Sequence, residues 1–378
     1  MVVSRRVFIR SFVSLSIFLK ISSHPLFAKE GASGAILDRR SNESIVDDSG
    51  SINAKEFLPR GYVTDGSVSY TKELQSALDY AANKSLKLLM PDFTVMVSPK
   101  NTLHGGLNIP SNSKIIFQKN SKVIIEPNDL GGYELFSIRD ASGIYIYGAN
   151  LVGDKYSHIG KSGEWGMCLS IKGDCNSIHI ENATITDAWG DGIYIGQVKD
   201  NRDSTPKNIT INNTVIKDCR RQGMSVITVD GLYVNNMFVS GTKSIDSPFK
   251  LANGPHAGLD LEPNSFSCIL KNIRIINLHG NDNDGGLFYV YLGSVFKNYD
   301  GNSLYDVDVS IDNLNDTDSL CGINLVGLSR KVKYIGSIKI ENFVSRNNRT
   351  SAIRFLDWIA LSPLPVYVNG KLLNVSAG

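Results

Sequence analysis

The chain has 378 residues, a formal net charge of +2 and an apolar fraction of 42%. Because positive and negative side chains are interspersed, no basic face is available for a nucleic-acid backbone, which argues against nucleic-acid binding. Asn and the 34 Gly residues fall in short clusters, as is typical of a protein with many short strands and turns. The length is compatible with one long β domain that has a continuous core.

The first 28 residues have the features of an export signal. Arg5 and Arg6 precede a modest apolar stretch that is too short, and too interrupted by Ser and Lys20, to span a bilayer. The pattern resembles a twin-arginine signal, and an ordinary secretory signal that contains two arginines is the alternative. Both predict cleavage near Ala28 and a periplasmic or secreted protein without a stable membrane anchor.

Residues 29–60 are polar and aperiodic, so we interpret them as a flexible leader before a domain at 61–378. One short helix is predicted where this domain begins, between Ser69 and Lys84, with Ser69 or Thr71 as the N-cap. Its apolar residues recur at helical spacing: Leu74, Ala77, Leu78 and Ala81. Such a helix would cover the open end of a coiled sheet, which otherwise exposes unpaired backbone groups and apolar side chains.

Internal repetition is the most informative feature of the sequence. One pattern, Gly (once Ala) followed by an apolar residue, any residue and an apolar residue, recurs at separations of roughly 26 to 36 residues. Its seven copies are 166–169, 192–195, 223–226, 258–261, 286–289, 322–325 and 352–355. A second strand-like series interleaves with it at 177–180, 208–211, 231–234, 272–275 and 337–340.

Two strand series per repeat, with no helix in each, predict a chain that winds around faces. The predicted fold is all-β, a single-stranded right-handed parallel β-helix with a short N-terminal capping helix. A β-propeller is the main alternative, but the tight two-residue hairpin turns that its blades need are not systematic here.

The most specific motifs are Gly190-Asp191-Gly192-Ile193-Tyr194-Ile195-Gly196, Arg220-Arg221-Gln222-Gly223 and Ala257-Gly258-Leu259-Asp260-Leu261-Glu262-Pro263-Asn264. With these motifs, the chain from about Gly61 to the C-terminus resembles the pectate-lyase-like superfamily of polysaccharide-processing proteins. The resemblance implies the same β-helix and a polysaccharide ligand. The Asp-Asp and Gly-His-Gly motifs of polygalacturonases and the Asp-Pro-His of mannuronan epimerases are absent from the repeats, so no catalytic assignment follows from the resemblance.

The register of the repeat predicts which side chains face outward. The residue after each Gly should point inward and the next one outward. This gives an outward row of Cys168, Tyr194, Ser225, Asp260, Phe288, Asn324 and Arg354. Glu262 shares a strand and a face with Asp260 at about 6.7 Å, and Asp191 lies two strands from Asp260, at about 10 Å.

Inverting glycoside hydrolysis needs two carboxyl groups about 6.5–9.5 Å apart. Asp260 with Glu262, or either with Asp191, is therefore predicted to be the acid and base, and we add Arg221 and His256 as catalytic candidates. Further side chains are predicted to bind substrate: Glu164, Trp165, Tyr194, Arg220, Gln222, Ser225 and Phe288. Arginine binds a uronate carboxylate bidentately and aromatic rings pack on sugar faces, so we expect an anionic or complex polysaccharide.

Several candidates also have a purely structural explanation. Asp191 would stabilise a turn between two glycines, while Arg220 and Arg221 would pair with Asp218 and Asp187. The five cysteines lack zinc-type spacing and are expected to be buried free thiols: Cys168, Cys175, Cys219, Cys268 and Cys321.

Three functions stay open at this point. Hydrolysis is slightly favoured. A lyase would use Arg220, Arg221 or His256 as the base, with calcium held by the acidic residues. A non-catalytic carbohydrate-binding protein, or one that assembles or epimerises an exopolysaccharide, would leave the polymer uncut. No other cofactor is predicted, and both a monomer and a homotrimer are compatible with the sequence.

Overall fold

The computed structural model describes residues 50–100, 102–244, 254–296, 299–328, 332–356 and 363–373. The predicted export signal, and the predicted leader up to residue 49, lie outside these residues. Helices in the described part of the chain lack the combination of length and apolar character needed to cross a bilayer. All five cysteines are buried and unpaired, as predicted.

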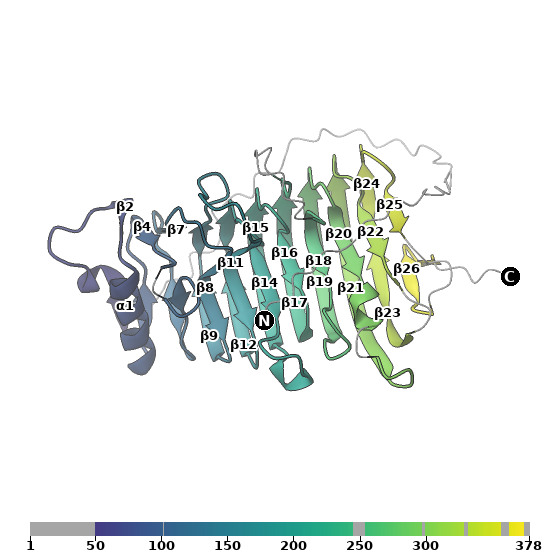
Figure 1. Ribbon diagram of the computed structural model, residues 1–378, viewed down its shortest axis with the longest axis horizontal. Coiled ribbons are helices and arrows are strands. Elements are labelled where there is room, and N and C mark those ends of the chain that lie inside the picture. The colour runs from purple at the N-terminus through teal and green to yellow at the C-terminus, as the bar shows by residue number, and fades with distance from the viewer. Residues whose placement is uncertain are drawn as a thin grey trace. The chain divides into compact units, whose positions relative to one another are not determined.

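The smaller of the two sheets is built from nine parallel strands (Figure 1). In order across the sheet they are β5 (Leu107–Asn108), β8 (Gly132–Arg139), β11 (Trp165–Lys172), β14 (Ile193–Gly196), β16 (Met224–Val226), β18 (Ala257–Leu261), β20 (Gly286–Tyr291), β22 (Ile323–Val326) and β25 (Ile353–Leu356). The last seven coincide with the seven copies of the Gly pattern, so that strand series is confirmed. Between successive strands the chain passes through the larger sheet, in the right-handed sense that crossovers prefer.

The larger sheet contains the other described strands. They are β1 (Ser51–Asn53), β2 (Asp65–Ser69), β3 (Lys87–Leu89), β4 (Thr94–Val97), β6 (Lys114–Ile116), β7 (Lys122–Ile125), β9 (Ser142–Tyr147), β10 (Asn150–Val152), β12 (Asn176–Glu181), β13 (Thr184–Thr186), β15 (Lys207–Lys217), β17 (Val229–Ser240), β19 (Leu270–Asn281), β21 (Leu304–Thr317), β23 (Lys333–Glu341), β24 (Val344–Arg346), β26 (Val366–Val368) and β27 (Lys371–Leu372). This sheet confirms the second predicted series. The right-handed parallel β-helix is therefore the fold of this chain.

The long strands of the larger sheet bend at asparagines. Asn213, Asn236, Asn277 and Asn313 adopt positive φ angles of 50–61°, a conformation that Asn tolerates better than most residues. Their side chains also stack: Nδ2 of Asn236 donates to Oδ1 of Asn213 at 2.8 Å, and Nδ2 of Asn313 to Oδ1 of Asn277 at 2.9 Å. Each such coil therefore contributes two rows of strand to the larger sheet and one to the smaller.

Inward side chains of both sheets form a continuous apolar core. The row from the smaller sheet is at most 1% exposed and consists of Leu169, Ile193, Met224, Leu259, Phe288 and Ile323. Burying a side chain of this size contributes about 1.5–3 kcal/mol. The prediction that Phe288 faces outward and binds substrate is therefore wrong.

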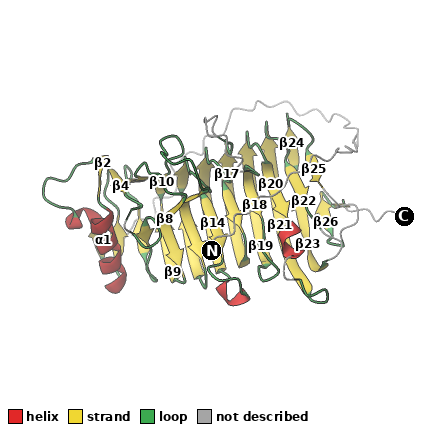
Figure 2. Cartoon of the chain, in the orientation of Figure 1, coloured by secondary structure: helices red, strands yellow, loops and turns green. Residues whose placement is uncertain are grey.

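Helix α1 (Thr71–Asn83) is the predicted helix, and it buries the four predicted residues (Figure 2). Its N-cap is Tyr70, without a side-chain cap, so the predicted caps are wrong. The hydroxyls of Ser69 and Thr71 instead accept a hydrogen bond from Ser98 N, at 3.1 and 2.7 Å. Three short 3₁₀ helices complete the described helical structure: η1 (Ala54–Phe57), η2 (Arg202–Ser204) and η3 (Gly293–Phe296).

The first elements lie within the range predicted as a flexible leader. Strand β1 pairs with β3 through Ser51–Lys87, Ile52–Leu88 and Asn53–Leu89. Residues 51–57 are therefore regular structure, and the described fold begins before the predicted boundary at residue 61.

Helix α1 also forms hydrogen bonds with backbone groups of the edge strand of the smaller sheet. Gln75 Nε2 donates to the Asn108 carbonyl, and the Asn108 N–H donates to Gln75 Oε1, both at 2.8 Å. Asn108 belongs to β5, the first strand of that sheet, so one side chain pairs a donor and an acceptor that an edge strand leaves unpaired.

Gln75→Ala should destabilise the fold by about 1–2 kcal/mol, because a partly buried N–H and C=O both lose their partner. Urea denaturation followed by far-UV circular dichroism measures the change. Lys72→Ala, at an exposed position of the same helix, should change the midpoint little. Equal midpoints for the two variants would contradict the capping role.

Candidate functional site

Outward side chains of the smaller sheet form a polar row. In pairing order the row is Ser137, Ser170, Tyr194, Ser225, Asp260, Tyr289, Asn324 and Arg354. Two predicted members are therefore wrong. Cys168 is buried in the core and Ser170 takes its place. Phe288 pairs with Leu259, a shift of one residue from the glycine alignment, so Tyr289 stands beside Asp260.

Asp260 is a carboxyl group without a conventional hydrogen-bond donor. The residue is 0% exposed, and within the described part of the chain no N–H or O–H donor reaches either of its oxygens. The remaining candidate for a hydrogen bond with Asp260 is the carboxyl group of Glu262, two residues later in the chain and partly exposed. Two carboxyl groups can share a hydrogen bond only when one of them is protonated. A proton on one of the two carboxyl groups would therefore let the pair share a hydrogen bond.

The environment of the pair favours that proton. Burial, followed by the nearby charge of Glu262, raises the pKa of Asp260 well above its ordinary value. Burial also raises the pKa of Glu262, against the opposing charge of Arg221. Asp260 and Glu262 thus act as one coupled unit, with Asp260 behind and Glu262 nearer the solvent.

Arg221 lies among four carboxyl groups. Its Nη1 is 3.4 Å from Asp191 Oδ2 and its Nε is 3.8 Å from Glu164 Oε2. Burial disfavours the charged guanidinium, but Asp191, Glu164, Glu262 and Asp260 outweigh it and raise the pKa of Arg221. Arg221 is therefore a permanent cation at the centre of the acidic residues, and the alternative pairing with Asp187 or Asp218 is not observed.

Asp191 is a member of this cluster and does not serve as a turn residue alone. Its side chain is 0% exposed, and Oδ1 has no partner among the described residues. Burial raises the pKa of Asp191, while Arg221 and a hydrogen bond from Ser225 oppose the shift. Ser225 is itself only 2% exposed, so it is placed to orient Asp191. The prediction that Ser225 contacts substrate at the surface is therefore wrong.

Arg220 has a structural role, which corrects its predicted contact with substrate. It is 1% exposed; its Nε donates to the Trp189 carbonyl at 2.5 Å and its Nη2 to the Gly163 carbonyl at 2.9 Å. The guanidinium lies 3.3 Å from the centre of the Trp189 ring, and His158 stacks on that ring at 3.8 Å. Burial lowers the pKa of Arg220 to about 10. Arg220 thus anchors the backbone that leads into Glu164.

Three other predicted substrate contacts can be placed. Gln222 is 0% exposed and its Oε1 accepts from Ala257 N at 2.7 Å, so it joins two coils and the predicted contact is wrong. Trp165 is 55% exposed and follows Glu164 directly. Tyr194 is partly exposed on the outward row, with Lys172 Nζ 4.6 Å from its ring centre.

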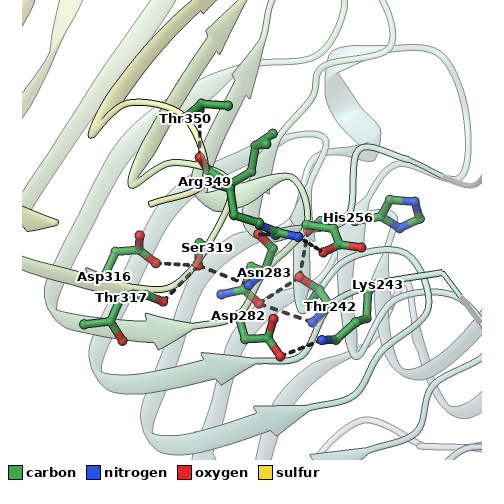
Figure 3. Close-up of polar contacts among 12 residues, drawn as sticks. Thr242, Lys243, His256, Asp282, Asn283, Asp316, Thr317, Ser319, Arg349 and Thr350 are labelled. Atoms are coloured by element: carbon green, nitrogen blue, oxygen red, sulfur yellow. Dashed lines mark hydrogen bonds and ion pairs between the residues drawn. The ribbon is translucent and has the colours of Figure 1, made fainter. Parts of the chain in front are cut away.

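His256 is held in one tautomer beside the cluster. Its Nδ1 donates to the Arg220 carbonyl at 2.9 Å, which leaves Nε2 with a lone pair in the neutral ring. Burial lowers the pKa of His256. Its own carbonyl lies 2.7 Å from the Thr242 hydroxyl, which also approaches Asn283 Oδ1 at 2.7 Å. Figure 3 shows this network, with the imidazole pointing away from it.

The network behind His256 links turns of three coils. Asn283 N donates to Ser319 Oγ at 3.1 Å, and Ser319 Oγ donates to Asp316 Oδ1 at 2.6 Å. Arg349 pairs with Asp284 at 2.7 Å (Figure 3). These contacts fix the backbone at His256 from one side while Arg220 fixes its ring from the other.

A second charged cluster, not among the predicted site residues, lies on the same face. Glu134 is 4% exposed and accepts hydrogen bonds from Ser137 Oγ at 2.6 Å, Lys172 Nζ at 2.7 Å and Arg139 Nε at 3.1 Å. Burial opposes the charge of Glu134, but these partners, Lys172 first, lower its pKa to about 2. Strand β8 begins with Gly132-Tyr133-Glu134-Leu135, which fits the Gly pattern 34 residues before the copy at 166–169, so the repeat itself could have identified this strand.

No cation site is evident in the described coils, since nowhere in them do three or more His, Cys, Asp or Glu side chains converge suitably for a metal ion. The acidic residues instead surround the Arg221 guanidinium.

No protein-family profile matches the chain. Among curated proteins it is similar to the SPbeta prophage-derived protein YorA of Bacillus subtilis strain 168, with 29% identity over 222 residues that cover 52% of this chain and 36% of YorA. It is also similar to YclG of the same organism, with 26% identity over 230 residues that cover 56% of this chain and 38% of YclG. The chain thus matches less than two fifths of the length of either relative.

Solved structures with a similar fold include an epimerase module and a bacteriophage tailspike. One is the A-module of the mannuronan C-5 epimerase AlgE4 of Azotobacter vinelandii, with 14% identity, a TM-score of 0.46 and coverage of 81% of this chain and 76% of that one. The other is the tailspike gp49 of Acinetobacter baumannii bacteriophage Fri1, a capsular polysaccharide depolymerase, with 12% identity, a TM-score of 0.47 and coverage of 78% and 50%.

Asp260→Asn should make the protein more stable at high pH. A carboxyl group whose pKa is raised in the native state binds more protons there than in the unfolded chain, so stability falls as pH rises from about 4 towards the native pKa. For one proton the slope is at most about 1.4 kcal/mol per pH unit. Chemical denaturation from pH 4 to pH 8 should show wild type losing stability relative to Asp260→Asn.

Asp308→Asn provides the matched control for this pH series, because it removes the same charge from an exposed position on β21. Its curve should run parallel to that of wild type. Parallel curves for Asp260→Asn as well would show that Asp260 holds no extra proton in the native state.

Proposed function

We propose that this chain is a polysaccharide-cleaving enzyme, a glycoside hydrolase whose acid is the Asp260–Glu262 pair. The observation that supports this proposal most directly is the position of Asp260 and Glu262 on the outward face of the smaller sheet, beside Arg221, where burial raises the pKa of both carboxyl groups. Cleavage of a glycosidic bond requires a protonated carboxyl group to donate to the leaving oxygen. Strongly shifted carboxyl groups of this kind are concentrated at functional sites.

Glu262 is the member of the pair that would reach substrate, because it is partly exposed whereas Asp260 is not. Asp260 would act as a positioning residue that keeps a proton available to Glu262. A hydrogen bond shared between the two carboxyl groups would leave no room between them for the attacking water, for which an acid and a base stand about 6.5–9.5 Å apart. The predicted division into Asp260 and Glu262 as acid and base is therefore not adopted.

Glu164 is the better candidate for the base. Its side chain is 32% exposed and it contacts the Nε side of Arg221, so it can accept a proton from a surface water molecule. Arg221 would hold Glu164 and the buried Asp191 in place, and the exposed Trp165 offers a ring on which a sugar can pack. The base and platform thus fall on the coil of β11 and the acid on the coil of β18, with Arg221, which leads into β16, in contact with Glu164.

A lyase mechanism has weaker support. Arg221 keeps its proton because four carboxyl groups stabilise its charge. Arg220 donates hydrogen bonds from Nε and Nη2 to backbone carbonyls. His256 is then the remaining base, with its Nε2 lone pair. A purely binding protein would gain nothing from a buried carboxyl pair that costs stability at neutral pH, which favours an enzyme over the non-catalytic alternative.

The partner and location follow the same proposal. A polysaccharide is the expected substrate, and named structural neighbours act on such polymers, including a capsular polysaccharide depolymerase. The Arg5-Arg6 signal favours action in the periplasm or outside the cell. Calcium would be expected only with elimination, and the choice between monomer and homotrimer stays a prediction.

Incubation with a panel of bacterial exopolysaccharides and uronate-rich polymers should yield shortened, saturated products that carry one added water, as detected by mass spectrometry. Glu262→Gln should lower the rate by about 10²–10⁴-fold because the proton donor is lost, and Asp260→Asn should also lower it. The matched control, Glu341→Gln at an exposed position of the larger sheet, should keep the wild-type rate.

The rate of the wild-type enzyme should fall as pH rises through the raised pKa of the pair, because the acid loses its proton. Unsaturated product ends would replace the hydrolase by a lyase and direct attention to His256. Equal rates for Glu262→Gln and Glu341→Gln would reject the assigned acid, and an uncut panel would reject the enzyme.

A further inference from the structure

We infer that Arg139, Lys172 and Ser170 form a separate binding site for an acidic substituent of the glycan, a carboxylate or a sulfate. The inference rests on the proposed polysaccharide substrate and specifies its chemistry. All three residues lie on the outward face of the smaller sheet, on the adjacent strands β8 and β11. Ser137 pairs with Ser170 and Arg139 with Lys172, which places two hydroxyls in one row and two cations in the next.

The cluster has an excess of positive charge. Glu134 supplies one negative charge against the two positive charges of Arg139 and Lys172, which leaves +1. Burial, and then the charge of Arg139, lower the pKa of the nearby His104, so it does not add a charge at neutral pH. Because Glu134 is held ionised, the net charge of the cluster stays at +1 at neutral pH, where the two cations are charged.

The two cations retain donors for a ligand. Glu134 receives hydrogen bonds from Nε and Nη2 of Arg139, whereas a guanidinium has five N–H donors. Lys172 gives Glu134 one of its three and lies against the Tyr194 ring. Their side chains are 25% and 16% exposed. An oxyanion at the surface can therefore meet both, and Arg presents the planar geometry that carboxylates and sulfates favour.

Ser170 provides the second, independent observation. It is 0% exposed, and its hydroxyl has no hydrogen-bond partner among the described residues. A buried hydroxyl without a partner is uncommon in native proteins. Ser170 is on the outward row between Ser137 and Tyr194, two residues before Lys172 on the same face. An anion that draws the flexible Lys172 side chain towards itself would uncover this hydroxyl and supply its missing acceptor.

The position of this site relative to the carboxyl pair defines a class of substrate. From β11 to β18 there are three strand steps, or about 14 Å. Around the cleavage site the negative groups are Glu164, Asp191 and the singly protonated pair, and the neighbouring cation Arg221 is already paired with two of them. An acidic sugar is therefore disfavoured there. The expected substrate is a heteropolysaccharide with a neutral residue at the cleaved bond and an acidic residue a few sugars along the chain.

Isothermal titration calorimetry on the full chain tests the site with three probes: tetragalacturonate, a sulfated galactan tetrasaccharide and neutral maltotetraose. Lys172→Met should weaken binding of at least one acidic probe about tenfold, the loss of one charge-assisted hydrogen bond, without affecting maltotetraose. Lys172→Arg should retain affinity. Lys339→Met, which removes the same charge from an exposed position on the larger sheet, should bind like wild type.

Whichever acidic probe shows the loss identifies the anion as a carboxylate or a sulfate. The site is rejected if neither acidic probe binds wild type, or if Lys172→Met and Arg139→Gln both bind them as wild type does. Arg139→Gln also serves if Lys172→Met fails to fold. Binding that depends on Lys172, without cleavage of any polymer, would retain the site and reject the hydrolase; cleavage without such binding would do the reverse.

Discussion

The backbone hydrogen bonds between successive coils are the constraint on which the rest of this structure depends. They fix each residue of the smaller sheet about 4.8 Å from its equivalent in the next coil, so outward side chains necessarily form columns. Like charges directly opposite one another are destabilising in a sheet. In the column that contains Asp260, the neighbours on either side are Ser225 and Tyr289, which carry no charge of the same sign.

Burial gives these few polar groups their chemistry. The carboxyl of Asp260, the carboxylate of Asp191 and the guanidinium of Arg221 are almost entirely shielded from water, yet they lie on the outward side of the sheet, because neighbouring coils cover them. Charges in such a place interact more strongly than in water. The two adjacent arginines have different roles. Arg220 donates hydrogen bonds to the backbone of Trp189 and Gly163, whereas Arg221 pairs with the acidic residues.

Much of the fold could be predicted from the sequence, because each coil of a solenoid repeats the same pattern of glycine and apolar residues, and such a repeat can be detected in a single sequence. The repeat predicts the seven Gly segments, and the helical spacing of apolar residues predicts α1. The grouping of Asp191, Arg221, Asp260 and Glu262 follows from the register. The errors arose where spacing does not determine direction. Phe288 was misplaced because Gly286 is shifted by one residue from Gly258, and Arg220 and Gln222 precede their strand, in a turn where alternation does not apply. Strand β21 has the same alternation of polar and apolar residues as the second series, although that series did not include it.

The connection between β10 and β11 suggests how such a protein diversifies. Residues 153–164 leave the sheet and return to it, and their conformation is held by the buried Asp154, which binds His158 and Asn128, and by the stack of His158 on Trp189. The strands on either side pair in the same register as their neighbours. Insertions or replacements in this connection would therefore alter the surface beside Glu164 and Trp165 while the column that contains Asp260 keeps its spacing. Related proteins could in this way vary one wall of the outward face on the same framework.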